Sequence, residues 1–163
     1  MGDLFLMAGC PGSGKSTFLK THVDLSNAVV ISRDEVRFSI VNPYESYFSH
    51  EKQVCEEFWS QINEALAEGK NVFADQTSLT PKARKYLLEN VTGYDHANLI
   101  WIDEDVETCI ARNEQRKGTR AYVPPQQVRR MHFQFVIPSL SEGFYRIYHY
   151  NSKEDKVTYI GAE

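Results

Sequence analysis

The residues most suggestive of chemistry form a glycine-rich run near the start of the chain. The run reads Gly9-Cys10-Pro11-Gly12-Ser13-Gly14-Lys15-Ser16 and is followed by Thr17. It matches the pattern G-x-x-x-x-G-K-S, in which glycines let the backbone wrap a polyphosphate with its N–H groups pointing inward. We expect Lys15 to reach the outer phosphates of ATP, and the Ser16 hydroxyl to ligate Mg²⁺. Residues 9–17 are therefore the predicted ATP site, with Lys15 as a catalytic cation.

The segments on either side of this run distinguish a phosphate loop from a glycine-rich turn that matches by chance. Five apolar residues precede it, Leu4-Phe5-Leu6-Met7-Ala8, and they are typical of a buried strand. The residues after it, 17–22, continue as a predicted helix. The positive end of that helix dipole favours phosphate binding. Because strand, glycine loop and helix follow in the order that the motif needs, we favour the phosphate loop.

A carboxylate and a guanidinium follow the second apolar segment. Asp34 and Arg37 lie three residues apart at the start of a predicted short helix, so they share one of its faces. Phosphoryl transfer needs a base for the proton of the attacking hydroxyl and a cation that holds an anionic substrate in line. Asp34 fits the first role and Arg37 the second. The alternative is a surface ion pair of little energetic weight.

A basic segment later in the chain contains Arg112 and Arg116, four residues apart on a predicted helix that runs out near Gly118. Like charges at this spacing disfavour a helix, so we expect a triphosphate to lie against both arginines. Residues 112–124 would then form a mobile lid over ATP. The alternative is a solvated basic helix end, which the helix dipole favours.

Asp75 closes the third predicted strand. A carboxylate at the end of a central strand can hold a Mg²⁺-bound water or orient a catalytic arginine. The alternative is a cap for the helix that follows.

Strand-like and helix-like segments alternate along the chain, which is typical of a parallel sheet with helices on both faces. We expect five parallel strands and an antiparallel edge strand, at residues 4–8, 27–31, 71–75, 98–102, 144–150 and 156–160. We expect a short helix at residues 33–40, followed by a core helix that Ser49 caps and to which we assign no chemistry. A later helix begins with Asp103, Glu104 and Asp105, and another begins at Pro125. The expected fold is a three-layer α/β P-loop NTPase sandwich, in a single kinase domain of residues 1–163. Ligands of such open sheets bind beyond the carboxyl ends of the strands, where the charged clusters described above lie.

Composition limits the class of protein. The chain has 163 residues, of which 42% are hydrophobic and 25% charged, with a net charge of −4, so it is ordinary globular material that does not coat nucleic acid with its whole surface. No apolar run approaches the ~20 residues of a membrane span, and we expect no membrane partner. The three cysteines, Cys10, Cys55 and Cys109, lack metal-ligand spacing. Their odd number, with no signal peptide in view, leads us to expect a cytoplasmic protein. Nothing in the sequence specifies an oligomeric state.

Four segments together resemble the kinase domain of the bacteriophage-type polynucleotide 5′-hydroxyl kinases. They are residues 9–17, 32–37 (Ser-Arg-Asp-Glu-Val-Arg), 74–81 (Ala-Asp-Gln-Thr-Ser-Leu-Thr-Pro), and Arg112-Asn113 with residues 116–119. The resemblance spans residues 1–135 and implies a general base at Asp34 and a grip on the acceptor's phosphate by Arg37. It also implies that Asp75 is functional, and we assign Asp75 together with Arg37 to substrate binding. It implies further that Arg116 stabilises the transferring phosphoryl group and that Arg112 lines the nucleotide site. Residues 38–49 match nothing in the family and are the natural place for acceptor specificity.

These observations predict an ATP-dependent kinase that uses ATP and Mg²⁺ and phosphorylates a hydroxyl, foremost the 5′-hydroxyl of a polynucleotide or a nucleotide. The aromatic residues Phe38, Tyr44, Tyr47 and Phe48 could stack bases of such an acceptor. One alternative is a small-molecule kinase for a nucleoside, sugar or antibiotic alcohol, which the size and mild acidity favour. The other is a nucleotide-binding switch without phosphotransfer, in which Asp34 and Arg37 have no obvious purpose.

Overall fold

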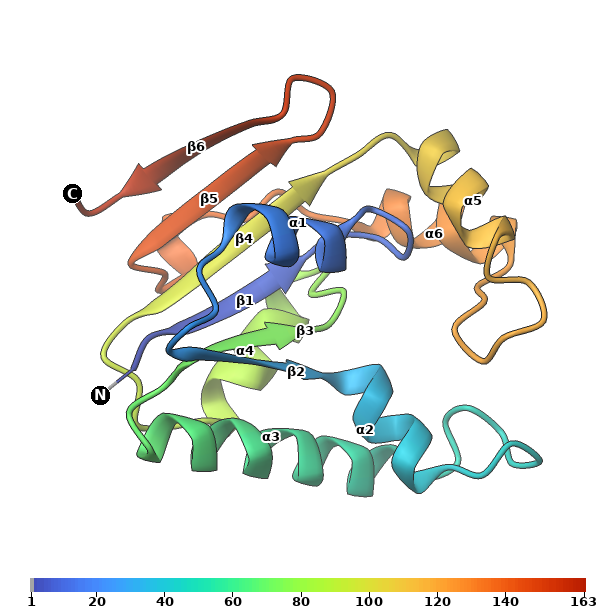
Figure 1. Cartoon of the computed structure of the whole chain (residues 1–163), viewed down its shortest axis with the longest axis horizontal. Helices are drawn as coiled ribbons and strands as arrows, with labels where there is room; N and C mark the ends of the chain where they lie inside the picture. Colours follow the sequence, from blue (N-terminus) through green and yellow to red (C-terminus); the bar gives the residue numbers. More distant parts are fainter. Residues whose placement is uncertain (1) are drawn as a thin grey trace.

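The computed structural model describes residues 2–163, which form one six-stranded sheet between helices (Figure 1). The strands are β1 (Leu4–Ala8), β2 (Ala28–Ser32), β3 (Asn71–Asp75), β4 (Ala97–Asp103), β5 (Arg146–Asn151) and β6 (Lys156–Gly161). The helices are α1 (Lys15–His22), α2 (Arg33–Ile40), α3 (Glu51–Ala67), α4 (Pro81–Asn90), α5 (Val106–Glu114) and α6 (Pro125–Gln134), with a short 3₁₀ helix η1 (Leu140–Glu142).

The sheet has the strand order β2-β3-β1-β4-β5-β6. The first five strands pair in parallel, and β6 pairs antiparallel with β5 across a short turn. This confirms the predicted P-loop NTPase sheet with its antiparallel edge strand. The fifth strand begins at Arg146, two residues later than predicted, because its pairing with β4 starts at the Asn98–Arg146 pair; Phe144 lies before the strand and is buried in the core.

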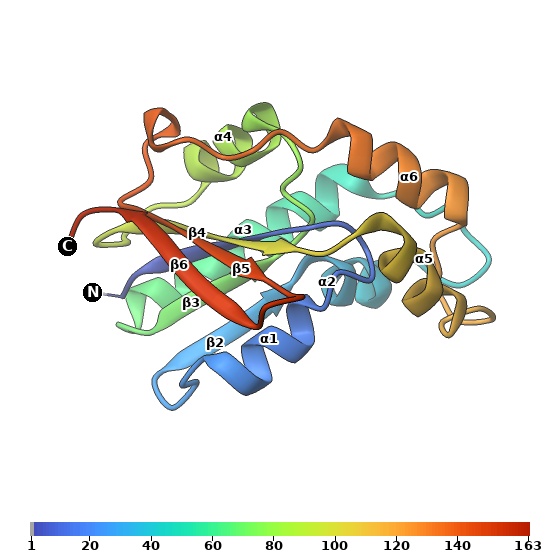
Figure 2. The ribbon, with the colours of Figure 1, turned by 90° about the horizontal axis from the view of Figure 1, so that it is seen from above.

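The two faces of β1 illustrate how the layers are held together. Leu4, Leu6 and Ala8 lie in one core cluster with buried side chains of α3 and α4, whereas Met7 lies in another with Phe18 and Leu19 of α1. Alternate residues of a strand point to opposite faces, so an apolar run of five can bury both. Figure 2 shows α1 on one side of the sheet and α4 on the other.

Helix α3 supplies the largest stripe of the core. The apolar side chains that its helical spacing predicts to face inward are all buried: Val54, Phe58, Ile62, Ala65 and Leu66. The helix ends before Gly69, whose φ of +81° suits glycine. The predicted Ser49 cap is wrong, because His50 occupies the cap position and the Ser49 hydroxyl donates to the Ser46 carbonyl instead.

All five parallel strands run in the same direction, so the segments that follow them gather at one edge of the sheet. The phosphate loop follows β1, Asp34 lies just after β2, and Asp75 ends β3. None of the helices formed by residues 2–163 combines the length and apolar character needed to cross a bilayer.

Candidate active site

The phosphate loop joins β1 to α1 and packs closely against α5. Gly14, with φ of +101°, caps the start of α1, and Gly12 also has a left-handed backbone with φ of +82°. A Cβ atom on Gly12 would lie 2.5 Å from the Cys109 carbonyl oxygen. Gly12 is therefore required by its conformation and by the close approach of α5 to the loop.

Lys15 lies on the first turn of α1 and folds over the loop. Its Nζ donates to the Gly9 carbonyl at 3.0 Å and to the Cys10 carbonyl at 3.3 Å. Burial lowers the pKa of the Lys15 ammonium, and the nearby Asp75 carboxylate partly offsets this effect. Lys15 and Asp75 are thus close enough to interact electrostatically, as a shared nucleotide site requires.

Asp75 carries a carboxylate that no side chain or backbone N–H of residues 2–163 satisfies by a hydrogen bond. Burial raises the pKa of Asp75, Lys15 opposes the rise, and the Asp34 carboxylate adds to it. The alternative role of Asp75, as a cap of the next helix, is excluded, because the Thr80 hydroxyl accepts the cap bond from the Ala83 N–H at 3.2 Å. A partly buried, unbonded carboxylate suits a cation or a cation-bound water.

The described part of the chain contains no group of three or more His, Cys, Asp or Glu side chains that could hold a metal ion by themselves. Mg²⁺ often binds through substrate phosphates, several waters and one or two protein oxygens rather than through such a group of side chains. The exposed Ser16 hydroxyl beside the phosphate loop and the Asp75 carboxylate fit that mode of binding.

Asp34 and Arg37 lie together on α2, as their spacing predicts. The helix begins at Arg33 because the Ser32 side chain accepts a capping bond from the Glu35 N–H at 3.3 Å. Arg37 Nη1 donates to Asp34 Oδ1 at 2.9 Å. The Asp34 side chain is 53% exposed and that of Arg37 only 5%, so Asp34 is the more accessible member of the pair.

Glu51, at the start of α3, is the partner of Arg37 that the sequence did not reveal. Arg37 Nη2 donates to both Glu51 carboxylate oxygens, at 2.7 and 3.0 Å, and Arg33 donates to the same carboxylate. An acidic residue in the first turn of a helix is also explained by the helix dipole. The residue type of Glu51 alone therefore did not indicate that it pairs with Arg37. Arg37 therefore uses its Nη groups within the protein, and a grip on an acceptor's phosphate would require it to exchange one of these bonds.

Arg112, on α5, binds the phosphate loop directly. Its Nη1 donates to the Gly12 carbonyl at 3.2 Å and to the Ser13 carbonyl at 3.1 Å. Its Nη2 lies 3.3 Å from Glu104, whose side chain is almost fully buried. The prediction that Asp103, Glu104 and Asp105 begin a helix is correct only for Asp105, which caps α5. Asp103 ends β4, and Glu104 anchors Arg112.

Arg116 does not share a helix with Arg112, contrary to prediction. Helix α5 ends at Glu114, and the chain continues in tight turns in which the Arg116 N–H donates to the Asn113 carbonyl at 2.9 Å. Gly118, with φ of +91°, lies in the same segment. Within residues 2–163 no partner binds the Arg116 guanidinium, yet its charge influences the pKa of both Lys15 and Asp75. Arg116 is thus an exposed cation directed at the predicted phosphate site.

The segment after α5, predicted as a lid, is tied to α2 on the other side of the site. Arg120 donates to the carbonyl oxygens of Phe38 and Val41, and its guanidinium lies 4.5 Å from the centre of the Phe38 ring. These contacts link residues that are about eighty positions apart in the chain. The predicted lid is therefore in contact with the helix that carries Asp34.

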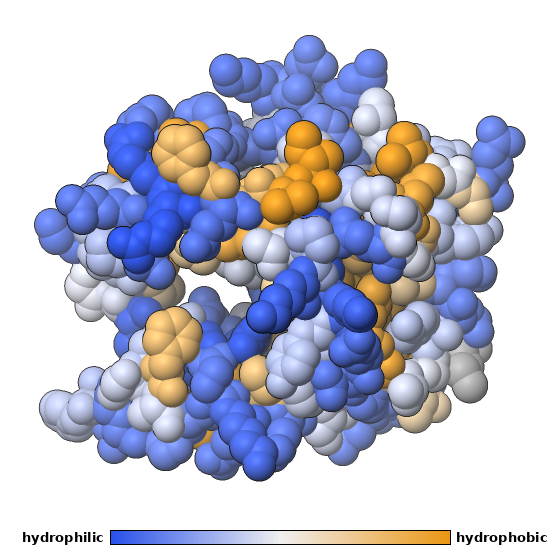
Figure 3. Space-filling view, turned by 180° about the vertical axis from the view of Figure 1, so that it is seen from behind, coloured by the Kyte–Doolittle hydropathy of each residue, from blue (hydrophilic) through white to orange (hydrophobic). Residues whose placement is uncertain are grey.

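A pocket of about 960 Å³ joins these elements. Every predicted chemical side chain lines it, namely Lys15, Ser16, Asp34, Arg37, Asp75, Arg112 and Arg116. So do parts of the lid and the aromatic residues Phe38, Tyr47 and Phe48. The space-filling view shows the molecule hollowed at this end (Figure 3). The volume of the pocket is at the upper end of the usual range for ligand pockets, so the pocket has room for more than one ligand group.

The family model described as AAA domain matches residues 4–138, a span that contains the phosphate loop, Asp34, Asp75 and the lid. A protein of Acanthamoeba polyphaga mimivirus, whose name provisionally assigns it polynucleotide phosphatase and kinase activities, is 27% identical over 151 residues. The match covers 89% of this chain and 32% of the mimivirus protein. The chain thus spans about a third of the length of that relative.

Solved structures share the fold. A chain of the Pnkp1/Rnl/Hen1 RNA repair complex aligns with a TM-score of 0.67 and 23% identity, over 82% of this chain and 43% of that one. A gluconokinase from Sinorhizobium meliloti aligns with a TM-score of 0.55 and 18% identity, over 84% of this chain and 76% of that one. At these identities the likeness concerns the fold, and it confirms the predicted P-loop NTPase architecture.

Proposed function

This chain belongs to the AAA domain family, and from that premise we propose that it is an ATP-dependent kinase whose acceptor is the 5′-hydroxyl of a polynucleotide or a nucleotide. The observation that carries the proposal is the shared pocket. It places a candidate base, Asp34, in the same space as the phosphate-binding groups Lys15 and Arg116. A nucleotide-binding switch would need the phosphate groups without the base.

In the proposed reaction the acceptor oxygen attacks the γ-phosphorus of ATP, and the bond to the β–γ bridging oxygen breaks as ADP leaves. Asp34 accepts the proton of the acceptor hydroxyl. Lys15 and Arg116 stabilise negative charge on the transferring group and on the departing phosphates. Mg²⁺, when bound with ATP, supplies further charge neutralisation, and Ser16 and Asp75 are the residues that would hold it.

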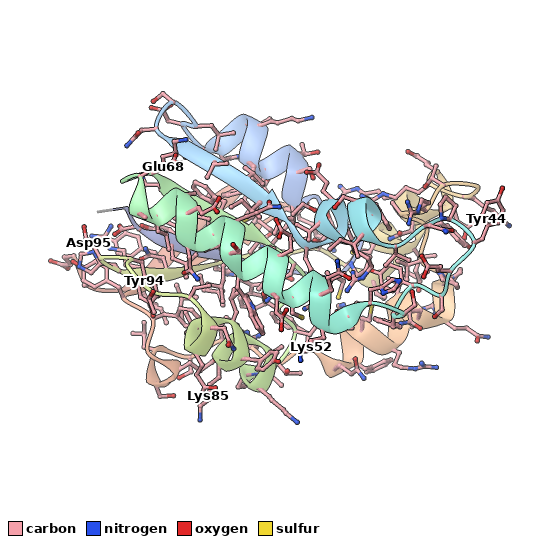
Figure 4. All side chains as sticks on the ribbon, turned by 90° about the horizontal axis from the view of Figure 1, so that it is seen from below. Tyr44, Lys52, Glu68, Lys85, Tyr94 and Asp95 are labelled. Atoms are coloured by element: carbon pink, nitrogen blue, oxygen red, sulfur yellow. The ribbon has the colours of Figure 1, made fainter. Side chains whose placement is uncertain are left out.

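The aromatic wall of the pocket favours a nucleic-acid acceptor. Phe38, Tyr47 and Phe48 line the pocket beside Asp34, and Phe48 is 64% exposed, so its ring is available for stacking on a base. Tyr44 is 98% exposed, lies outside the pocket lining and points away from the body of the molecule (Figure 4). We therefore leave Tyr44 out of the proposed acceptor site. The names of the mimivirus relative and of the RNA repair complex support the same class of acceptor.

The experiment is transfer of radiolabelled γ-phosphate from ATP to single-stranded DNA and RNA oligonucleotides with 5′-hydroxyl ends. Matched oligonucleotides with 5′-phosphate ends, and the Asp34→Asn variant, are the controls. We expect labelling of hydroxyl ends only. The absence of transfer to any DNA, RNA or nucleotide acceptor would refute the polynucleotide proposal.

A small-molecule kinase is the second candidate, because the gluconokinase shares the fold over most of both chains. The same assay with nucleosides and sugar alcohols separates the two candidates. Efficient labelling of a small alcohol without labelling of oligonucleotides would favour the second.

A further inference from the structure

We propose that Tyr47 is a positioning residue of the kinase reaction, which holds one oxygen of the Asp34 carboxylate so that the other oxygen is presented to the acceptor hydroxyl. The inference rests on the proposed function of Asp34 as the base. Tyr47 lies in the loop between α2 and α3, within residues 38–49, which match nothing in the polynucleotide 5′-hydroxyl kinases that the chain resembles.

The three side chains form a closed triangle of hydrogen bonds. The Tyr47 hydroxyl donates to Asp34 Oδ1 at 2.5 Å, and Arg37 Nη1 donates to the same oxygen at 2.9 Å. Arg37 Nη1 also donates to the Tyr47 hydroxyl oxygen at 2.6 Å. Each of the three groups is therefore bonded to the other two.

The triangle is attached to rigid parts of the fold. The Tyr47 ring lies against the Arg37 guanidinium, 4.1 Å from its central carbon, and meets the Phe48 ring edge-on at 4.7 Å. Arg37 is itself anchored to α3 by its bidentate contact with Glu51. Burial and the Asp34 carboxylate raise the pKa of the Tyr47 phenol, so it remains a protonated donor over the working range of a kinase.

The second carboxylate oxygen has a different environment. Both hydrogen bonds to the Asp34 side chain end on Oδ1, and Oδ2 accepts none from the described residues 2–163. Asp34 lines the pocket with Lys15, and its side chain is 53% exposed. Rotation about the bond to an Asp carboxylate is otherwise soft, so the two bonds to Oδ1 determine where Oδ2 lies. Fixing a base in advance lowers the entropic barrier of the reaction.

The same hydrogen bond admits an opposite role. If the Tyr47 hydroxyl occupied the place of the acceptor hydroxyl, Tyr47 would be an obstacle that the acceptor displaces. The bonds to Arg37 favour positioning, because Tyr47, Arg37 and Asp34 are held as one unit and Oδ2 stays available. The two roles predict changes of opposite sign when the hydroxyl is removed.

The test is Tyr47→Phe, which keeps the ring against Arg37 and removes only the hydroxyl. Because the lost hydrogen bond is to a charged group, we expect kcat for phosphoryl transfer to fall about tenfold or more, while the KM for ATP stays within about twofold. The matched control is Tyr44→Phe in the same loop, which should leave both parameters unchanged. An unchanged kcat in Tyr47→Phe, or a higher kcat/KM for the acceptor, would overturn the proposal.

A second measurement separates this proposal from the proposed function. Denaturation midpoints of Tyr47→Phe, Asp34→Ala, which removes the acceptor oxygen, and the double variant are compared without any substrate. We expect the two shifts to be non-additive, since both variants break the same bond. Additive shifts would overturn the positioning role even if the wild-type protein proved to have a different acceptor. Absence of transfer by the wild-type protein, with non-additive shifts, would refute only the kinase reaction.

Discussion

Replacement of Glu51 by Gln tests how the acceptor side of the pocket is held together. Glu51 is the counter-ion of an arginine whose side chain is only 5% exposed, and it accepts two hydrogen bonds from that arginine, at 2.7 and 3.0 Å. Removing one partner of a fully buried ion pair costs about 3–5 kcal/mol. The Glu51 side chain is 33% exposed and Asp34 still faces Arg37 in the variant. We therefore expect a smaller loss, about 2 kcal/mol.

For a domain of this size, a loss of about 2 kcal/mol corresponds to a fall in the melting temperature of about 4–8 °C. Differential scanning calorimetry and urea denaturation of Glu51→Gln would measure both quantities. Glu56→Gln is the matched control, because Glu56 lies on the same helix and is exposed. We expect the control to change stability by less than about 0.5 kcal/mol. Equal effects of the two substitutions would refute the claim that Glu51 neutralises the buried Arg37.

Four further substitutions test the rest of the site. Lys15→Ala removes a fixed cation from the phosphates and should lower kcat at least about 100-fold without unfolding the protein, as transfer assays and circular dichroism would show. Asp34→Asn should lower kcat about 10²- to 10⁴-fold and leave the Kd for ATP unchanged; a parallel loss of ATP affinity would contradict a role as base. Asp75→Asn should raise the melting temperature at pH 7 without nucleotide. Burial raises the pKa of Asp75 in the folded protein, so the ionised carboxylate destabilises the fold. The stabilising contribution of the protonated carboxyl is complete below the ordinary pKa of 3.8 and is lost as the pH rises through the folded-state pKa. The gain should therefore shrink toward pH 4, and a gain independent of pH would contradict the assignment. Arg120→Ala releases the lid from α2 and should raise the KM for ATP roughly fivefold in steady-state kinetics, with an unchanged KM as the contrary result.

The local chemistry of the chain was sufficient to predict the scaffold of the site. The apolar run of residues 4–8 and the glycine loop after it predict β1, the phosphate loop and α1, because each depends on neighbours in sequence. The bounds of α2 at residues 33–40 are predicted for the same reason. Parallel strands place their carboxyl ends at one edge, so the order of the elements also brought Asp34, Asp75 and Lys15 to one pocket.

The tertiary structure decided which groups hold the chemical side chains in place. Glu51 binds Arg37, Glu104 binds Arg112 and Tyr47 binds Asp34, and in each case the partners come from different elements. A carboxylate at a helix start or an aromatic residue in a loop has several ordinary explanations, so residue type alone does not identify its partner. The end of α5 at Glu114 is a similar case, since the sequence predicts a helix that runs to near Gly118, whereas the structure has turns from Gln115 onward. The sequence by itself determined the phosphate loop and the gathering of the charged residues at the carboxyl ends of the parallel strands. Packing between α2, α3, α5 and their loops determined which charges are paired and which face the pocket.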